Sequence, residues 1–290
     1  MSGRVRYNWH MTGRGTSALV LGGGGITGIA WELGILTGLA EAGVDLTDAD
    51  IVVGTSAGSV VGAQVTNGQP LEDLYATQLE PADDELGGRL SRIAALKLVP
   101  PYVLPGSGRD KLARVGRVAL ASHAPGSVDR ESVIRSRLPV RDWPDRDLRV
   151  TAVDAGSGEF TVFTRDSDVD LVAAVAASCA VPTVWPPVEV GGRTYMDGGM
   201  RSTANVDVAR GAERVVVLAP LPRSMSKKVS IRAQLERVGP RAWSVVTPDA
   251  EALAAFGRNL LDPSKRKGAA VAGLRQSRML VDQLRRVWDA

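Results

Sequence analysis

The chain has 290 residues, of which 44% are apolar and 23% are charged, so it can bury a full hydrophobic core. This composition excludes disordered and collagen-like chains. A single cysteine, Cys179, and only two histidines exclude an intrachain disulfide and the usual zinc cages. No export signal is readable, and no stretch approaches the ~18 uncharged apolar residues of a membrane span. We therefore expect a cytoplasmic protein that is at most peripheral to a membrane.

Charge is unevenly distributed along the chain. The formal net charge is +3, but residues 221–290 contain 14 Lys or Arg against 6 Asp or Glu. The first 220 residues are therefore slightly acidic. A basic end on an acidic body indicates either contact with an anionic surface or a solvated basic helix.

The N-terminal third predicts a parallel sheet. Residues 1–16 are polar and aperiodic, as expected for a flexible arm. An apolar strand at 17–22 stops at four glycines and precedes a helical pattern over 26–42. A second strand at 50–55 and a second helix at 57–66 repeat this order. Such an alternation predicts right-handed crossovers between parallel strands.

The remaining sequence continues the alternation and then becomes helical. Further helices are expected at 71–79, 109–121, 128–137 and 171–178, and further strands at 148–154, 159–164 and 214–220, with a hairpin over 188–199. The apolar, proline-broken stretch at 93–105 predicts a wall or lid of a binding site, or ordinary packing.

These elements predict one three-layer α/β/α domain with a mostly parallel central sheet over residues 17–220. Residues 1–16 form its arm, and residues 221–290 form a basic helical extension packed on or beside it.

The motif G-T-S-A-G, Gly54 to Gly58, lies between a predicted strand and a predicted helix. This is the context of a nucleophile elbow, in which flanking glycines relieve crowding while the serine Oγ is exposed. Gly54 and Gly58 are then the elbow glycines and Ser56 is the candidate nucleophile. The alternative is an ordinary glycine-rich turn with a capping serine.

A second glycine-rich loop, G-G-G-G-I-T-G, spans Gly22 to Gly28. Its spacing matches a dinucleotide-binding fingerprint, but the acid expected at the end of the next strand is instead Asp50, at that strand's beginning. The loop also suits an anion hole, because it precedes a helix and emerges at the same sheet edge as Ser56.

No histidine occupies the place of a general base. His10 lies in the arm, and His123 lies in a poorly patterned region. The candidate is Asp197 in D-G-G, at the end of the second hairpin strand, where Gly198 and Gly199 allow the backbone to close around a neighbouring group.

Together the three motifs resemble the patatin-like phospholipase family. The glycine-rich loop, G-T-S-A-G-S and D-G-G occur in the family's order, and the segment A-S-C-A-V-P-T-V-W-P-P-V before D-G-G is also similar. The resemblance covers roughly residues 17–220. It implies a patatin-like fold, a Ser56–Asp197 dyad, and an oxyanion hole formed by Gly23, Gly24 and Gly25.

The sequence departs from this family at position 27. Members usually carry Arg or Lys there, before the last glycine of the loop, whereas this chain has Thr27. The departure predicts that a positive charge near the site is lost. It also predicts a preference for uncharged or single-chain acyl esters over diacyl phospholipids.

Other candidates have structural interpretations. Asp154 is a competing acid at a strand end, more often a turn cap. The alternating acids at 166–170 lack the glycine and the twelfth-position carboxylate of a calcium loop, so we expect a solvated helix start. Cys179 is expected to be a core residue. No metal site is predicted.

The sequence therefore predicts a serine acyl hydrolase that cleaves carboxylic esters of lipids, as a lysophospholipase, phospholipase A or general lipid esterase, without a cofactor. Two alternatives are a catalytically silent lipid-binding scaffold of the same fold and a dinucleotide-binding protein. No nucleic-acid partner is expected.

The last helix has two faces and predicts either peripheral contact with an anionic membrane or docking on its own domain. Its apolar face would contain Val271, Leu274, Val281, Leu284 and Trp288, and its basic face Arg275, Arg278, Arg285 and Arg286.

Overall fold

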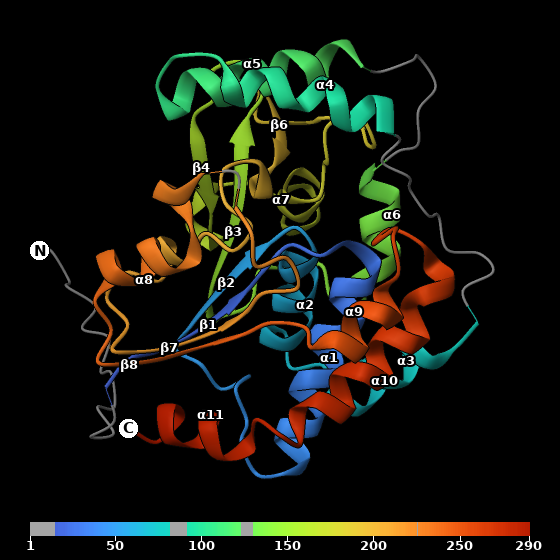
Figure 1. The fold of residues 1–290 in the computed structure, drawn as a ribbon, viewed down its shortest axis with the longest axis vertical. Coiled ribbons are helices and arrows are strands. Elements are labelled where there is room, and N and C mark those ends of the chain that lie inside the picture. Colours follow the sequence, from blue (N-terminus) through green and yellow to red (C-terminus); the bar gives the residue numbers. More distant parts are fainter. Residues whose placement is uncertain (1–14, 82–91, 123–129, 225) are drawn as a thin grey trace, which may run out of the picture.

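A mostly parallel eight-stranded sheet forms the centre of the molecule (Figure 1). The structure is a computed structural model, and it describes residues 15–81, 92–122, 130–224 and 226–290. Five parallel strands in the order β8-β7-β1-β2-β3 continue into antiparallel β6 and β5, and β4 pairs with β3. The strands are β1 (Ser17–Leu21), β2 (Ile51–Thr55), β3 (Asp147–Asp154), β4 (Phe160–Phe163), β5 (Val188–Val190), β6 (Arg193–Asp197), β7 (Arg214–Leu218) and β8 (Ala242–Val246).

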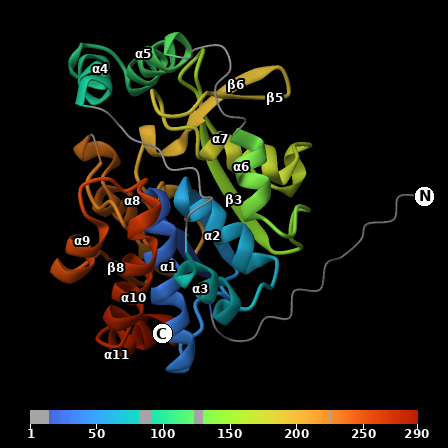
Figure 2. The same cartoon turned by 90° about the vertical axis from the view of Figure 1, so that its right-hand side faces the viewer.

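Helices cover both faces of this sheet, so the predicted α/β fold with C-terminal helices is confirmed (Figure 2). The helices are α1 (Gly25–Glu41), α2 (Ala57–Thr66), α3 (Leu71–Leu79), α4 (Arg92–Val103), α5 (Gly108–Ala121), α6 (Arg130–Arg137), α7 (Leu171–Ser178), α8 (Ile231–Val238), α9 (Ala250–Phe256), α10 (Arg266–Ser277) and α11 (Val281–Trp288).

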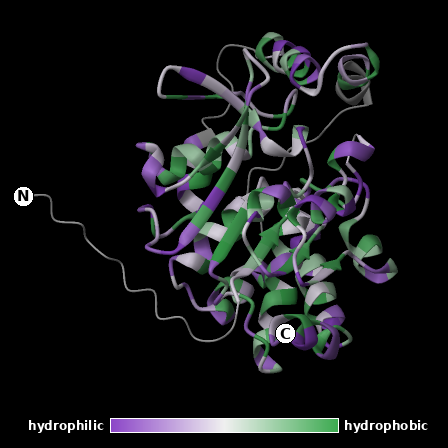
Figure 3. Cartoon of the chain, turned by 90° about the vertical axis from the view of Figure 1, so that its left-hand side faces the viewer, coloured by the Kyte–Doolittle hydropathy of each residue, from purple (hydrophilic) through white to green (hydrophobic). Residues whose placement is uncertain are grey.

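The core divides according to the alternation of side chains along the strands. Leu19 and Leu21 of β1 pack on one face with α1, α2 and α10, whereas Ala18 and Val20 pack on the other with α8. Buried strands of this kind are almost wholly apolar, as the hydropathy colours of the central sheet show (Figure 3). A third, smaller cluster joins α5 to the ends of β3 and β6.

Two strands meet end to end at the edge where the parallel strands finish. In the register of β3, Thr151 pairs with Thr55 of β2, and the next residue, Ala152, pairs with Asp197 of β6. Since β4 occupies the other side of β3, β6 continues on the same side as β2 and runs toward it. The ends of β2 and β6 therefore meet beside the middle of β3.

The region after residue 220 differs from the sequence prediction in two ways. It contributes a strand, β8, which pairs in parallel with β7. The single last helix expected from the sequence is instead two helices, α10 and α11, separated by a short turn. Leu284 and Trp288 are buried as expected, but Val271 is 48% exposed because α10 turns a different face toward the domain.

Small residues allow α10 to pack closely against α1, and the two helices lie side by side in both ribbon views (Figures 1 and 2). A Cβ added at Gly34 would overlap the Ala270 carbonyl oxygen, and one added at Gly273 would overlap the Trp31 carbonyl oxygen. The C-terminal residues are thus part of the core of the structure and are no loose tail.

Candidate active site

The turn between β2 and α2 has the backbone geometry of a nucleophile elbow. Ser56 has φ 52° and ψ −117°, a strained conformation for a residue with a side chain. Its neighbours need to be glycine: a Cβ at Gly54 would lie 2.5 Å from the Ser59 Cα, and one at Gly58 would overlap the Leu21 carbonyl. The local sequence therefore forces the chain to turn sharply at Ser56.

Two residues at the C-terminal end of α7 hold the elbow in place. The Ser56 amide donates to the Ser178 Oγ at 2.9 Å, and the Cys179 Sγ lies 3.3 Å from the Ser56 carbonyl oxygen. Ser59 Oγ donates to the same carbonyl at 2.6 Å. Cys179 is 4% exposed, consistent with the predicted core residue. Sequence analysis did not single out Ser178.

The glycine-rich loop lies against the elbow, as the shared sheet edge predicts. The Gly22 carbonyl accepts the Gly58 amide at 3.0 Å, and a Cβ at Gly23 would lie 3.5 Å from the Ser56 Cβ. The Gly23 amide already donates to the Thr203 carbonyl at 2.7 Å. Within the described residues, the amides of Gly24 and Gly25 donate to no backbone carbonyl. These two amides are therefore the available donors of the loop.

Asp197 lies at the end of β6, beside the end of β2, and is only 2% exposed. Its amide donates to the Ala180 carbonyl at 3.0 Å, and its Oδ1 accepts the Gly199 amide at 2.7 Å. Gly198 permits this close approach, because a Cβ there would lie 2.5 Å from the Thr151 carbonyl oxygen. The structure therefore places the candidate base at the strand end that faces the elbow.

A buried asparagine ties these strand ends together. Asn205 is fully buried and left-handed, with φ 48°. Its Nδ2 lies 3.1 Å from the Thr55 Oγ1, 3.3 Å from the Thr151 Oγ1 and 3.2 Å from the Gly198 carbonyl oxygen. One side chain thus contacts β2, β3 and the turn after Asp197. Sequence analysis missed Asn205 because its contacts with Thr55 and Thr151 join segments that are distant in sequence.

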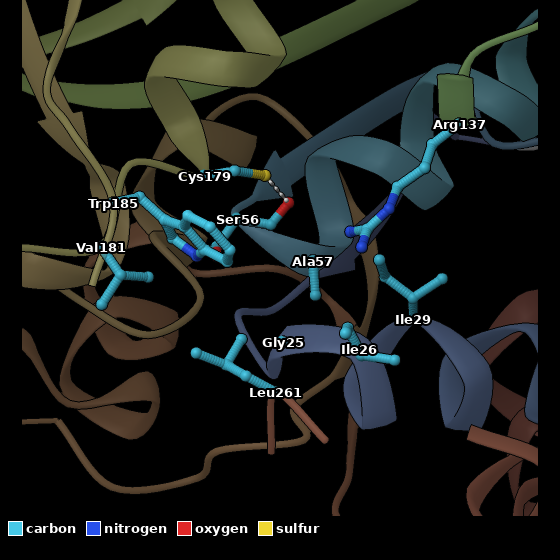
Figure 4. Close-up of a pocket in the computed structure, with 10 residues that line it drawn as sticks. All are labelled: Gly25, Ile26, Ile29, Ser56, Ala57, Arg137, Cys179, Val181, Trp185 and Leu261. Atoms are coloured by element: carbon cyan, nitrogen blue, oxygen red, sulfur yellow. Dashed lines mark hydrogen bonds between the residues drawn. The ribbon is translucent and has the colours of Figure 1, made fainter. Parts of the chain in front are cut away.

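A small pocket opens beside Ser56 (Figure 4). Most of its lining residues are apolar, but one guanidinium is among them. The cation that the family usually carries at position 27 is absent, and a different cation, from α6, lies in the pocket wall. The lining residues are Gly25, Ile26, Ile29, Ser56, Ala57, Arg137, Cys179, Val181, Trp185 and Leu261.

The stretch expected to form a wall or lid contributes to α4, which packs over the turn that follows Asp197. Tyr102 donates its hydroxyl to the Met200 carbonyl at 2.7 Å. Burial raises the pKa of Tyr102, and the Asp197 carboxylate raises that pKa further. Tyr102 therefore stays neutral near Asp197 and covers this side of the site. Its side chain is not part of the pocket wall.

A second buried carboxyl lies behind the glycine-rich loop. Glu32 of α1 is fully buried, and neither carboxyl oxygen has a hydrogen-bond partner among the described residues. Burial raises the pKa of Glu32 well above its ordinary value, and the nearby Gly22 amide only partly offsets this. Burial therefore favours the neutral, protonated form of the Glu32 carboxyl.

The competing candidates have structural roles or lie outside the described residues. Asp154 caps the β3–β4 turn, since its Oδ1 accepts the amides of Gly156 and Ser157 at 2.9 and 2.7 Å. Asp170 caps α7. In the described ranges, no group of three or more His, Cys, Asp or Glu could hold a metal ion. His10 and His123 lie outside those ranges, as does most of the expected arm.

Among the helices that the structure describes, none combines the length and the apolar character that a membrane crossing requires.

A sheet edge with a strained serine, a glycine-rich loop and a buried carboxylate defines the class of α/β proteins built around a nucleophile elbow. A family model for patatin-like phospholipase matches residues 19–210. The chain belongs to the patatin-like phospholipase family, whose members are typically lipid acyl hydrolases. The resemblance inferred from the three sequence motifs is thereby confirmed.

Three solved structures are also similar to this chain. VipD from Legionella pneumophila is 14% identical, with a TM-score of 0.48, and the match covers 93% of this chain and 67% of VipD. The type III effector ExoU is 16% identical, with a TM-score of 0.45 and coverage of 93% and 53%. ExoU of Pseudomonas aeruginosa in complex with SpcU is 17% identical, with a TM-score of 0.41 and coverage of 95% and 53%. The chain spans about half the length of ExoU, and the family assignment rests on the family model.

Proposed function

We propose that the protein is a serine acyl hydrolase that cleaves carboxylic esters of lipids through a Ser56–Asp197 dyad. The observation that carries this proposal is the end-to-end meeting of β2 and β6, because it brings a strained serine and a buried carboxylate to adjacent positions beside β3. Family membership supports the lipid substrate.

Asp197 accepts and returns one proton in each half of the reaction. The carboxylate accepts the Ser56 proton while Oγ attacks the ester carbonyl carbon, and the proton then passes to the leaving alcohol as the C–O bond breaks. Water next attacks the acyl-serine, giving its proton to Asp197. The acyl group leaves as a carboxylic acid, and Ser56 regains its proton.

The developing oxyanion needs donors on the loop side of Ser56. The Gly24 and Gly25 amides are suited to this role, and the Ala57 amide at the start of α2 adds a third donor. Gly23 contributes by close approach to Ser56, since its amide already bonds Thr203. None of these steps requires a metal or an organic cofactor.

The test is turnover of a short-chain ester together with labelling by a fluorophosphonate. Ser56→Ala should abolish both. Cys179→Ser is the matched control, because it replaces the other nucleophile in the pocket and keeps a donor beside the Ser56 carbonyl. It should stay within a few fold of wild type. Wild-type turnover by Ser56→Ala would refute the proposal, and the absence of both labelling and turnover in the wild type would favour the catalytically silent scaffold.

Dinucleotide binding is less well supported. Asp50 lies at the opposite end of β2 from the glycine-rich loop, and its carboxylate accepts the amide and hydroxyl of Ser17 at 2.8 Å. The acid that would bind a ribose is therefore on the wrong edge of the sheet.

A further inference from the structure

Position 27, where the family usually has a cation, is enclosed in this protein. Thr27 is fully buried, its amide donates to the Leu260 carbonyl at 3.1 Å, and its Oγ1 lies 3.4 Å from the carbonyl oxygens of Gly24 and Leu260. The segment after α9 thus covers this position. Thr27 is not among the residues that line the pocket.

The cation of the pocket comes instead from Arg137, the last residue of α6 (Figure 4). In the close-up, Arg137 and Trp185 lie at opposite ends of the pocket with Ser56 between them. The guanidinium extends toward Ala57 and Ile29. In a substrate whose ester lies at Ser56, a charged group next to that ester could reach this guanidinium.

Arg137 is fixed relative to the elbow by its own backbone. Its carbonyl accepts the Gln64 Nε2 at 2.9 Å, and Gln64 belongs to α2, the helix that begins after Ser56. Its neighbours Ile134 and Leu138 are buried in the main core. The end of α6 and the nucleophile are thus parts of one packed unit.

The chemistry of the pocket favours an anion at that end. The other large side chains of the wall are apolar, so the rest of the pocket favours contact with an apolar chain over contact with a charged group. A guanidinium binds phosphate with two parallel hydrogen bonds, and such contacts are stronger where water is partly excluded.

We propose, on the basis of the proposed hydrolase function, that Arg137 is a specificity residue that binds a phosphate next to the scissile ester. The enzyme then prefers single-chain acyl esters with a phosphate to neutral esters of the same chain. This reverses the preference for uncharged esters that Thr27 alone predicts, and leaves the expected preference for single-chain substrates in place.

The experiment compares kcat/KM for a short-chain monoacylglycerol and for its phosphate, both kept monomeric. Wild type should prefer the phosphate. Arg137→Met should lower kcat/KM for the phosphate ester roughly 10- to 100-fold more than for the neutral ester, mainly through KM, and Arg137→Lys should recover part of the loss. Arg135→Met, an exposed residue of the same helix, is the control and should leave the ratio unchanged.

A second measurement separates this contact from turnover. Calorimetry of a short alkyl phosphate with Ser56→Ala should show binding that Arg137→Met weakens by a similar factor, while thermal melting confirms that both variants fold. An unchanged substrate ratio or unchanged phosphate binding in Arg137→Met would overturn the specificity role. Activity that persists in Ser56→Ala would instead overturn the proposed hydrolase mechanism, whatever Arg137 does.

Discussion

The candidate catalytic residues lie before position 220, whereas the residues after it mainly contribute to the packing of the fold. Ser56, Asp197 and the glycine-rich loop all lie in the first region, on the edge of the sheet where the parallel strands end. The second region supplies β8 and the helix α10, which packs against α1 through glycine contacts. Of the residues that the structure describes in this region, Leu261 alone lines the pocket.

We therefore expect that mutations can change the reaction rate and the stability of the fold separately. Changes at the strand ends of the first region should lower the rate and leave the fold intact. Changes at the α1–α10 contact should lower stability and leave the rate per folded molecule intact. Variants in the two regions therefore distinguish effects on rate from effects on stability.

The largest expected effect is on rate, in the first region. Asp197→Asn should lower ester hydrolysis by ~10²–10⁴-fold, because the base is lost while an oxygen remains to accept the Gly199 amide. The measurement is kcat, with a circular dichroism spectrum to confirm folding. Asp154→Asn, at a strand end but in a turn cap, should stay within a few fold of wild type.

Neither histidine is expected to take part in the reaction. His10→Ala and His123→Ala should each stay within a few fold of wild type. A His123→Ala enzyme as inactive as Ser56→Ala would indicate a triad and remove the dyad.

The next effect is on stability, in the second region. Gly273→Ala should lower the free energy of unfolding by about 1–3 kcal/mol, because its Cβ would overlap the Trp31 carbonyl and force α10 away from α1. Gly268→Ala, in the same helix, meets only the Ala255 Cβ at 3.7 Å and should be neutral or stabilising. Urea unfolding measures both. Equal losses would mean that helix propensity, and not the contact, sets the result.

The buried carboxyl of Glu32 should make the stability of the fold depend on pH. Because burial raises its native pKa, the folded state keeps a proton that the unfolded state releases. Stability should therefore fall as the pH rises from the unfolded pKa toward the native pKa, by at most about 1.4 kcal/mol per pH unit. Glu32→Gln should lack this fall, whereas Glu41→Gln, on the exposed end of α1, should keep it. Urea unfolding across pH 5 to 9 distinguishes them, and identical curves for wild type and Glu32→Gln would contradict the assignment.

The smallest expected effect is on membrane binding by Arg278 and Arg286, two exposed arginines of the second region. We propose that they bind anionic vesicles, at roughly 1 kcal/mol per engaged arginine and with strong salt dependence. Removing residues 263–290 would also remove the α1–α10 contact, so the sharper change is Arg278→Gln with Arg286→Gln, both exposed. Arg232→Gln on α8 is the control. Vesicle sedimentation that the double variant does not alter would mean that these helices serve only the fold.

The sequence could predict elements whose signals are local. The elbow is specified by the residues from β2 to the start of α2, so Ser56, Gly54 and Gly58 were identifiable. Asp197 was identifiable because D-G-G is itself a short motif. Strand β8 was missed, since its five residues are half exposed and their neighbourhood is basic, although Pro240 and Pro248 bound them.

Contacts between distant segments left no such pattern. Asn205 joins the ends of β2 and β6 to the middle of β3 through a side chain whose partners are brought together by the register of the sheet. Arg137 reaches the pocket because α6 is anchored to α2, and nothing in its own neighbourhood marks it. Physical reasoning from sequence finds residues that shape their own turn, and it misses residues positioned by the rest of the fold.

The segment that covers the glycine-rich loop also has a consequence for biosynthesis. The Leu260 carbonyl and the Leu261 side chain complete a wall whose opposite side, at Ile26 and Ile29, is synthesised more than 200 residues earlier. At roughly 5–20 residues per second, the ribosome needs on the order of 10–40 s to produce the missing part. The pocket beside Ser56 is therefore complete only after nearly the whole chain has been made.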